Sequence, residues 1–214
     1  MAIFSTINFN IIQEACKSAH NYSKMIALIG YPGAGKTVGL NYYKQENEKV
    51  VYLIVRKSMS TKEFYLEMLN EVGFEGDAVN VTLYNIINLI IKKIELQKGK
   101  FLLIIDEAGK FKPKQLEYIH ELRDRTEGNM GIILAGPEYF YDNLYKWKQK
   151  KVIGIPEVFR RIQVFETLRP IMFNEIKSIC IAMGISDILT IKEKFRDCEN
   201  YGELMNSIYF ELEE

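Results

Sequence analysis

A glycine-rich segment of eight residues contains the residue types that bind phosphate. It reads GYPGAGKT, residues 30–37, and fits the pattern G-x-x-x-x-G-K-[ST] at every specified position. The glycines let the backbone wrap around phosphate oxygens, the lysine can reach the β- and γ-phosphates, and the threonine hydroxyl can ligate Mg²⁺. We therefore expect ATP and Mg²⁺ to bind here, with contacts from Gly30, Tyr31, Pro32, Gly33, Ala34, Gly35, Lys36, Thr37 and Val38.

Two acidic residues stand at the end of a later apolar segment. The segment FLLIID ends in Asp106, and Glu107 follows directly. A carboxylate at the tip of a buried strand is suited to orient the Mg²⁺ water shell opposite Thr37, and its neighbour can polarise the attacking water. The pattern predicts hydrolysis of ATP, with Lys36 and Glu107 as catalytic residues and with Thr37 and Asp106 at the metal.

Five short apolar runs, separated by helical patterns, are expected to position these residues. The runs are MIALIG, VVYLIV, FLLIID, GIILAG and IQVFETL, and helical spacing also marks the N-terminus. Such alternation predicts an α/β fold with a five-stranded parallel sheet between helices. After Arg169 and Pro170 three helical stretches follow. We expect an N-terminal helix or linker, an α/β core and a small helical lid, over residues 1–22, 23–169 and 170–214.

Composition narrows the class of protein. Lys plus Arg and Asp plus Glu are both 28, so the formal net charge is zero, and any nucleic-acid contact must come from local clusters. The cysteines Cys16, Cys180 and Cys198 form no disulfide framework, and with only His20 and His120 no Cys/His metal cluster is expected. We expect no signal peptide, no membrane span and a cytoplasmic location.

The order of motifs resembles an AAA+ ATPase and, more narrowly, the transposition-regulating ATPases of the MuB/TnsC type. The resemblance extends from about residue 22 to the C-terminus and rests on GYPGAGKT, LLIIDEAGK, GIILAGPEYF and PEVFRRI. It implies ATP-driven filaments or rings on double-stranded DNA, disassembled by hydrolysis that a transposase often stimulates. Arg160 or Arg161 falls where that family places an arginine finger, which acts on the ATP of a neighbouring subunit. The sequence does not choose between the two arginines.

Two positions depart from the AAA+ pattern. The fourth apolar run ends Leu134-Ala135-Gly136-Pro137, without the polar residue that many AAA+ proteins use to position water. In the lid, Met205 stands where many carry an arginine. Both departures predict slow intrinsic hydrolysis that assembly or partners control.

Three basic groups are candidates for contact with DNA, and each is also compatible with a solvated loop. Phosphate contact without base reading would make the binding largely independent of sequence, and assembly would multiply weak contacts. The groups are Lys146, Lys148, Lys150 and Lys151 around Trp147; Arg56, Lys57 and Lys62 after the second strand; and Lys110 and Lys112, with Lys114, after the acidic pair.

Other functions remain open for the same motifs. A helicase loader or another protein-remodelling AAA+ ATPase would share the fold and the site. A nucleotide switch with little hydrolysis is compatible with the missing polar residue after the fourth run. A small-molecule kinase is disfavoured, because a kinase gains little from the water-polarising Glu107.

Overall fold

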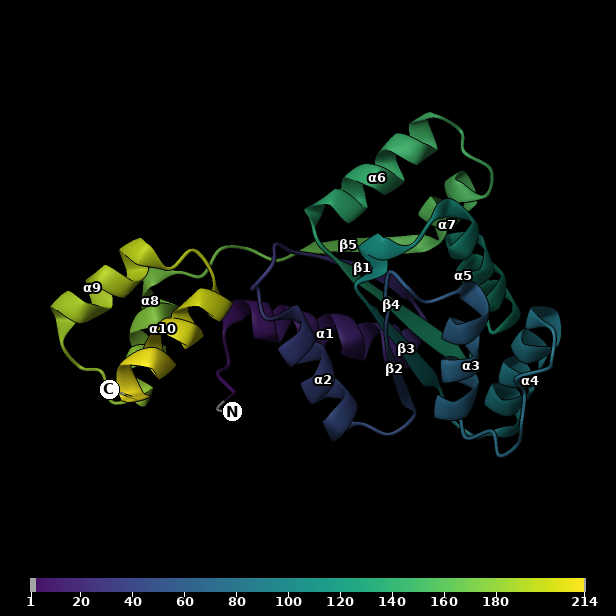
Figure 1. Cartoon of the computed structure of the whole chain (residues 1–214), viewed down its shortest axis with the longest axis horizontal. Helices are drawn as coiled ribbons and strands as arrows, with labels where there is room; N and C mark the ends of the chain where they lie inside the picture. The colour runs from purple at the N-terminus through teal and green to yellow at the C-terminus, as the bar shows by residue number, and fades with distance from the viewer. Residues whose placement is uncertain (1–2, 214) are drawn as a thin grey trace.

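Five parallel strands form one sheet at the centre of the molecule. The computed structural model describes residues 3–213. The strand order is β2-β3-β4-β1-β5, and the strands run over Met25–Ile29 (β1), Val50–Ile54 (β2), Phe101–Asp106 (β3), Met130–Gly136 (β4) and Ile162–Thr167 (β5). Each pairing is parallel. The five-stranded parallel sheet expected from the apolar runs is confirmed (Figure 1).

The strand order brings two distant motifs to the same edge of the sheet. β4 lies between β1 and β3, with Ile29 opposite Gly136 and Ile105 opposite Leu134. The phosphate-binding segment follows β1, and Asp106 ends β3. Open parallel sheets bind ligands outside the carboxyl ends of their strands, where the strand order reverses. The two motifs therefore meet at such a crevice.

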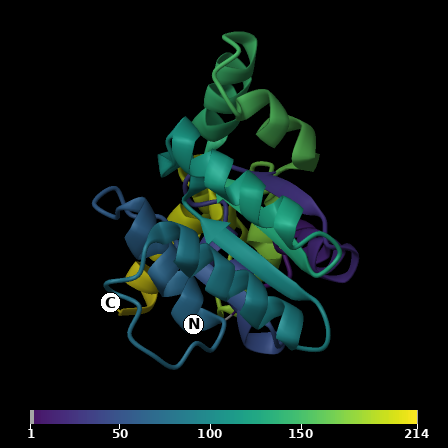
Figure 2. The ribbon, with the colours of Figure 1, turned by 90° about the vertical axis from the view of Figure 1, so that its right-hand side faces the viewer.

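Helices cover both faces of the sheet, as Figures 1 and 2 show. Alternate strand residues face opposite layers, so Ile104 packs with α1 and α2 while Leu103 packs with the other layer. The first face carries Ile7–Tyr22 (α1) and Lys36–Glu46 (α2). The second carries Thr61–Glu71 (α3), Leu83–Leu96 (α4), Pro113–Arg125 (α5), Glu138–Gln149 (α6) and Ile155–Arg161 (α7), with the 3-10 turn Ala108–Lys110 (η1) after β3.

The N-terminal helix is packed directly on the sheet. Ile12, Ala15 and Ala19 of α1 are buried among residues of β1, β3 and β4. At Gly131 on β4 a Cβ atom would lie 2.0 Å from the carbonyl oxygen of Ala19, so only glycine permits this close approach. Ile12 also fills the space beside Gly39 of α2. α1 thus supports the helix that follows the phosphate-binding segment.

The last three helices form a separate cluster beside α1 and α2. They are Phe173–Ala182 (α8), Ile188–Asp197 (α9) and Tyr201–Glu213 (α10), shown in yellow and yellow-green in Figure 1. They enclose their own apolar core, which includes Ile176, Ile191 and Leu204. Across the described residues 3–213, every helix is too short or too polar to cross a membrane.

Candidate nucleotide-binding site

The phosphate-binding segment forms a tight loop between β1 and α2. Gly33 and Gly35 have φ angles of 80° and 86°, in the left-handed region that favours glycine. α2 begins at Lys36, so its free backbone N–H groups and the positive end of its dipole face the loop. This arrangement is an anion-binding site of the kind expected from the sequence.

The ammonium of Lys36 lies inside the loop. Its Nζ donates to the carbonyl oxygens of Gly30 at 2.5 Å and Tyr31 at 2.9 Å. Burial lowers the pKa of Lys36, and the carboxylates of Asp106 and Glu107, with a third from Glu138, oppose that shift. The cation is thus held close to the phosphate cradle by weak neutral acceptors that a phosphate can replace.

Asp106 is a buried carboxylate surrounded by neutral donors. It is 1% exposed, and its Oδ2 accepts hydrogen bonds from Thr37 Oγ1 and Tyr52 Oη, each at 2.8 Å. Its Oδ1 accepts from the backbone N–H of Glu107 at 2.8 Å. Within residues 3–213 no side chain forms an ion pair with it, and a buried unpaired charge is costly. The hydroxyl and carboxylate oxygens fit a hard divalent cation such as Mg²⁺.

Tyr52 is a member of this site that the sequence did not reveal. It occupies β2, and its register opposite Ile104 places it beside the end of β3. Burial and the adjacent Asp106 raise the pKa of the phenol, so Tyr52 is a neutral hydrogen-bond donor at pH 7. In the sequence it was one residue of an apolar run, and only the strand pairing gives it a polar partner.

Glu107 has an unusual backbone and a specific partner. Its φ angle of 59° is left-handed, which is strained for a residue other than glycine and is common at functional sites. Its half-exposed carboxylate lies 3.2 Å from the ammonium of Lys110, on η1. A carboxylate at this position can polarise water, provided that Lys110 releases it.

A small apolar pocket adjoins the phosphate loop. It lies where the N-terminal segment, the loop and α10 meet, and its volume of about 10 Å³ is at the lower limit for a single water molecule. Its lining residues are Ile3, Phe4, Thr6, Phe9, Ala34, Gly35, Val38 and Tyr201. The sequence analysis had singled out Ala34, Gly35 and Val38, and the other five come from segments distant in the chain.

The C-terminal cluster of α8, α9 and α10 touches the phosphate loop through the segment that leads into α10. The backbone N–H of Gly202 donates to the carbonyl oxygen of Gly33 at 3.0 Å, and the side chain of Asn200 packs against Gly33. Met205, which stands where many AAA+ proteins carry an arginine, is 1% exposed inside the apolar core of this cluster. The cluster therefore contacts the loop through a backbone hydrogen bond and through the side chain of Asn200.

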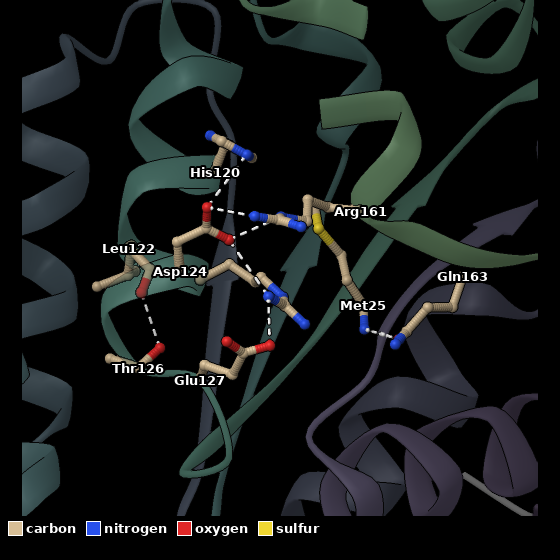
Figure 3. A network of polar contacts seen from close by, with 9 residues as sticks. Met25, His120, Leu122, Asp124, Thr126, Glu127, Arg161 and Gln163 are labelled. Atoms are coloured by element: carbon tan, nitrogen blue, oxygen red, sulfur yellow. Dashed lines mark hydrogen bonds and ion pairs between the residues drawn. The ribbon is translucent and has the colours of Figure 1, made fainter. Parts of the chain in front are cut away.

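The structure separates the two candidate arginine fingers. Nε and Nη2 of Arg161 each donate to a carboxylate oxygen of Asp124 at 2.8 Å, and Figure 3 shows this pair between α7 and α5. Hydrogen bonds from Arg161 and Arg123 hold the pKa of Asp124 below its ordinary value. Arg160 is exposed and has no side-chain partner among residues 3–213. Arg161 thus fastens α7, a helix the sequence analysis had not predicted, while Arg160 is free to contact another molecule.

A basic groove of about 750 Å³ opens beside Glu107. It lies between the segment after β2 and the segment that runs from η1 into α5. No carboxylate is among its described lining residues. Its walls contain five cationic side chains and two tyrosines, which are Arg56, Lys57, Lys110, Lys112, Lys114, Tyr118 and Tyr139. Four of the predicted DNA candidates are therefore brought together, and Lys114 joins them. Lys62 is not part of the lining, because its Nζ donates to the carbonyl oxygen of Val79.

The basic cluster around Trp147 lies elsewhere. Lys146 and Lys148 are on α6, whose far end projects from the body of the molecule, as Figure 2 shows, and Lys150 and Lys151 follow it. The ammonium of Lys148 stands 3.9 Å from the centre of the Phe159 ring, a cation–π contact. The structure thus gives Lys148 a local partner and does not bring this cluster into the groove.

Comparison with known proteins identifies the class. A family model described as AAA domain matches residues 19–144, more than half of the chain, so the chain belongs to the AAA domain family. It is an AAA-type P-loop ATPase domain. No curated protein matches the sequence.

Solved structures of the same fold include a protein in complex with DNA and a replication initiation protein. The ORC1 protein of Aeropyrum pernix, in complex with DNA, has 12% identity and a TM-score of 0.65, over 94% of this chain and 58% of that one. The Walker-type ATPase paby2304 of Pyrococcus abyssi has 14% identity and a TM-score of 0.62, over 93% and 70%. Domain III of DnaA from Thermotoga maritima has 17% identity and a TM-score of 0.58, over 98% and 84%.

These likenesses bear on the fold alone. The AAA-type fold expected from the motifs is confirmed, and the matches do not show the narrower likeness to MuB/TnsC-type proteins. This chain spans less than two thirds of the ORC1 chain.

Proposed function

We propose that this AAA domain is an ATP-hydrolysing switch that assembles on double-stranded DNA. The observation that carries the proposal is the position of the basic groove, which opens beside Glu107 and shares Lys110 with it. A polyanion in the groove would draw Lys110 away from Glu107. One side chain thereby links a phosphate-binding surface to the carboxylate that we assign to hydrolysis.

The chain's own residues divide the work of hydrolysis. Backbone N–H groups of the loop and Lys36 bind the phosphates, and Thr37 and Asp106 would hold Mg²⁺. When bound, Mg²⁺ supplies positive charge that neutralises the phosphate oxygens. Glu107 orients and polarises the attacking water once Lys110 has left it.

Self-assembly would complete the site. Arg160 is exposed at the end of α7 and lacks a partner among residues 3–213, so we assign it as the finger that reaches the ATP of a neighbouring subunit. A finger supplied in trans raises hydrolysis by about 10³–10⁵. Hydrolysis would then depend on a filament or ring, consistent with the missing polar residue after β4.

Contact with DNA would be electrostatic and largely independent of sequence. The groove presents five cations, which are suited to contact phosphates. Each phosphate neutralised contributes about −0.9 to the slope of log affinity against log salt. Because the chain has no net charge, useful affinity requires many subunits bound side by side.

Two biological roles fit such a switch. The motifs LLIIDEAGK, GIILAGPEYF and PEVFRRI favour regulation of DNA transposition, in which the assembly recruits or activates a transposase. The fold shared with ORC1, solved as a DNA complex, and with DnaA motivates the second role, that of a helicase-loader-like ATPase. Stimulation of hydrolysis by a transposase, as opposed to a replicative helicase, would separate the two.

The test follows particle size by light scattering and negative-stain microscopy. A non-hydrolysable ATP analogue is added with and without duplex DNA, and long particles are expected only when both are present. Lys36→Ala should abolish them. Lys112→Glu/Lys114→Glu should weaken DNA-dependent growth, whereas Lys150→Glu/Lys151→Glu, an equal charge change outside the groove, should not. A nucleotide-bound protein that stays monomeric with DNA would overturn the proposal.

A further inference from the structure

The buried Asp106 carboxylate has one donor to which the chemistry above gives no role, the hydroxyl of Tyr52. Tyr52 Oη donates to Asp106 Oδ2 at 2.8 Å, and that oxygen also accepts from Thr37 Oγ1 at 2.8 Å. The other oxygen, Oδ1, accepts the backbone N–H of Glu107. Hydrogen bonds therefore fix the carboxylate at both of its oxygens.

The strand register holds the phenol in this place. Tyr52 pairs with Ile104, and two residues later Ile54 pairs with Asp106, at the carboxyl end of β3. The ring of Tyr52 packs against the apolar cluster under α1 and α2. The ring is thus anchored in the core, and its hydroxyl reaches the edge of the sheet where Asp106 stands.

We infer that Tyr52 is a positioning residue for the Mg²⁺ site and that it acts through Asp106. This inference rests on the proposed nucleotide site. Thr37 is itself required as a ligand, so Tyr52 is the side-chain donor that orients Asp106 Oδ2 without also binding the cation. Outer donors of this kind typically contribute about 10–100-fold to metal affinity or activity.

The test separates the cation from the nucleotide by measuring binding alone. Affinity for a fluorescent non-hydrolysable ATP analogue is measured in EDTA and across a Mg²⁺ titration. Tyr52→Phe should leave the affinity in EDTA unchanged and raise the Mg²⁺ concentration at the midpoint by about tenfold. Tyr65→Phe is the matched control: Tyr65 is fully buried on α3, and its hydroxyl has no partner within residues 3–213, so the wild-type midpoint is expected.

A double-mutant cycle tests the route through Asp106. In an Asp106→Asn background, Tyr52→Phe should cause no further loss, because the group that it orients has already been altered. The inference would be overturned if Tyr52→Phe left the Mg²⁺ midpoint unchanged, or if it weakened analogue binding in EDTA as much as in Mg²⁺. It would also be overturned if Tyr52→Phe raised the midpoint in the Asp106→Asn background by the same factor as in the wild type. Wild-type protein that fails to bind the analogue at all would instead overturn the proposed nucleotide site. Thermal unfolding of each variant verifies that it is folded.

Discussion

An arginine finger in trans can be tested by mixing two inactive variants. Glu107→Gln keeps the phosphate loop and Arg160 but lacks the carboxylate that polarises water. Arg160→Ala keeps a complete loop, Asp106 and Glu107 but cannot assist its neighbour. Arg160 is exposed and has no partner among residues 3–213, whereas Arg161 is tied to Asp124, so this substitution should leave the fold unchanged.

The expected recovery follows from the geometry of an asymmetric interface. A productive site needs an Arg160→Ala subunit holding ATP and a Glu107→Gln subunit on the side that supplies the arginine. In an equal, random mixture each condition holds at half of the positions, so about one quarter of the interfaces are productive. Arg160→Ala alone should be slower than wild type by about 10³-fold or more, the range of effect of such fingers. Glu107→Gln alone should be slower by about 10²–10⁴-fold, the range of effect of a general base.

The assay is phosphate release per subunit in the presence of ATP, Mg²⁺ and duplex DNA, as the ratio of the two variants is varied. Activity should pass through a maximum at the equal mixture, near one quarter of the wild-type value. A mixture no faster than its components would refute the trans assignment of Arg160. The assignment would also be refuted if Arg160→Ala alone hydrolysed ATP at the wild-type rate while Arg161→Lys was inactive. In Arg161→Lys the new lysine can still pair with Asp124, so such a loss would point to Arg161 as the finger.

Three further outcomes are expected. Gly131→Ala should lower the free energy of unfolding by about 3 kcal/mol in urea titrations, because its Cβ meets a backbone carbonyl of α1 at 2.0 Å and one of the two elements must move. Lys110→Met should raise hydrolysis without DNA severalfold and reduce its stimulation by DNA, because it frees Glu107 from its partner at 3.2 Å; an unchanged ratio of the two rates would count against that coupling. The pKa of Asp124 is lowered chiefly by hydrogen bonds from Arg161, so its contribution to stability is complete above its unfolded pKa of about 3.9 and is lost at lower pH. In acid unfolding followed by circular dichroism, Asp124→Asn should therefore reduce the loss of stability below that pH.

The local motifs could be predicted because their chemistry is contiguous in the chain. Phosphate binding by residues 30–37 needs only a strand, a glycine-rich turn and the start of a helix, all of which the sequence encodes in order. The apolar runs predicted the five strands for the same reason, and β1, β3 and β4 are buried along their whole length, whereas the edge strand β5 is buried only at Ile162. The short helix α7 was missed, because its seven residues are too few to display a helical period.

The contacts between distant segments depended on the tertiary structure. The order β2-β3-β4-β1-β5 and the register of β2 against β3 bring Tyr52 to Asp106, and neither follows from the composition of a strand. Because α5 packs against α7, Arg161 forms hydrogen bonds with Asp124, whereas Arg160 is exposed. The groove admits Lys114 and excludes Lys62 because side-chain direction depends on the helix that carries each lysine. The sequence by itself predicted which residues would bind the phosphates, and the tertiary structure decided their partners, because those contacts join residues that only strand order and helix packing bring together.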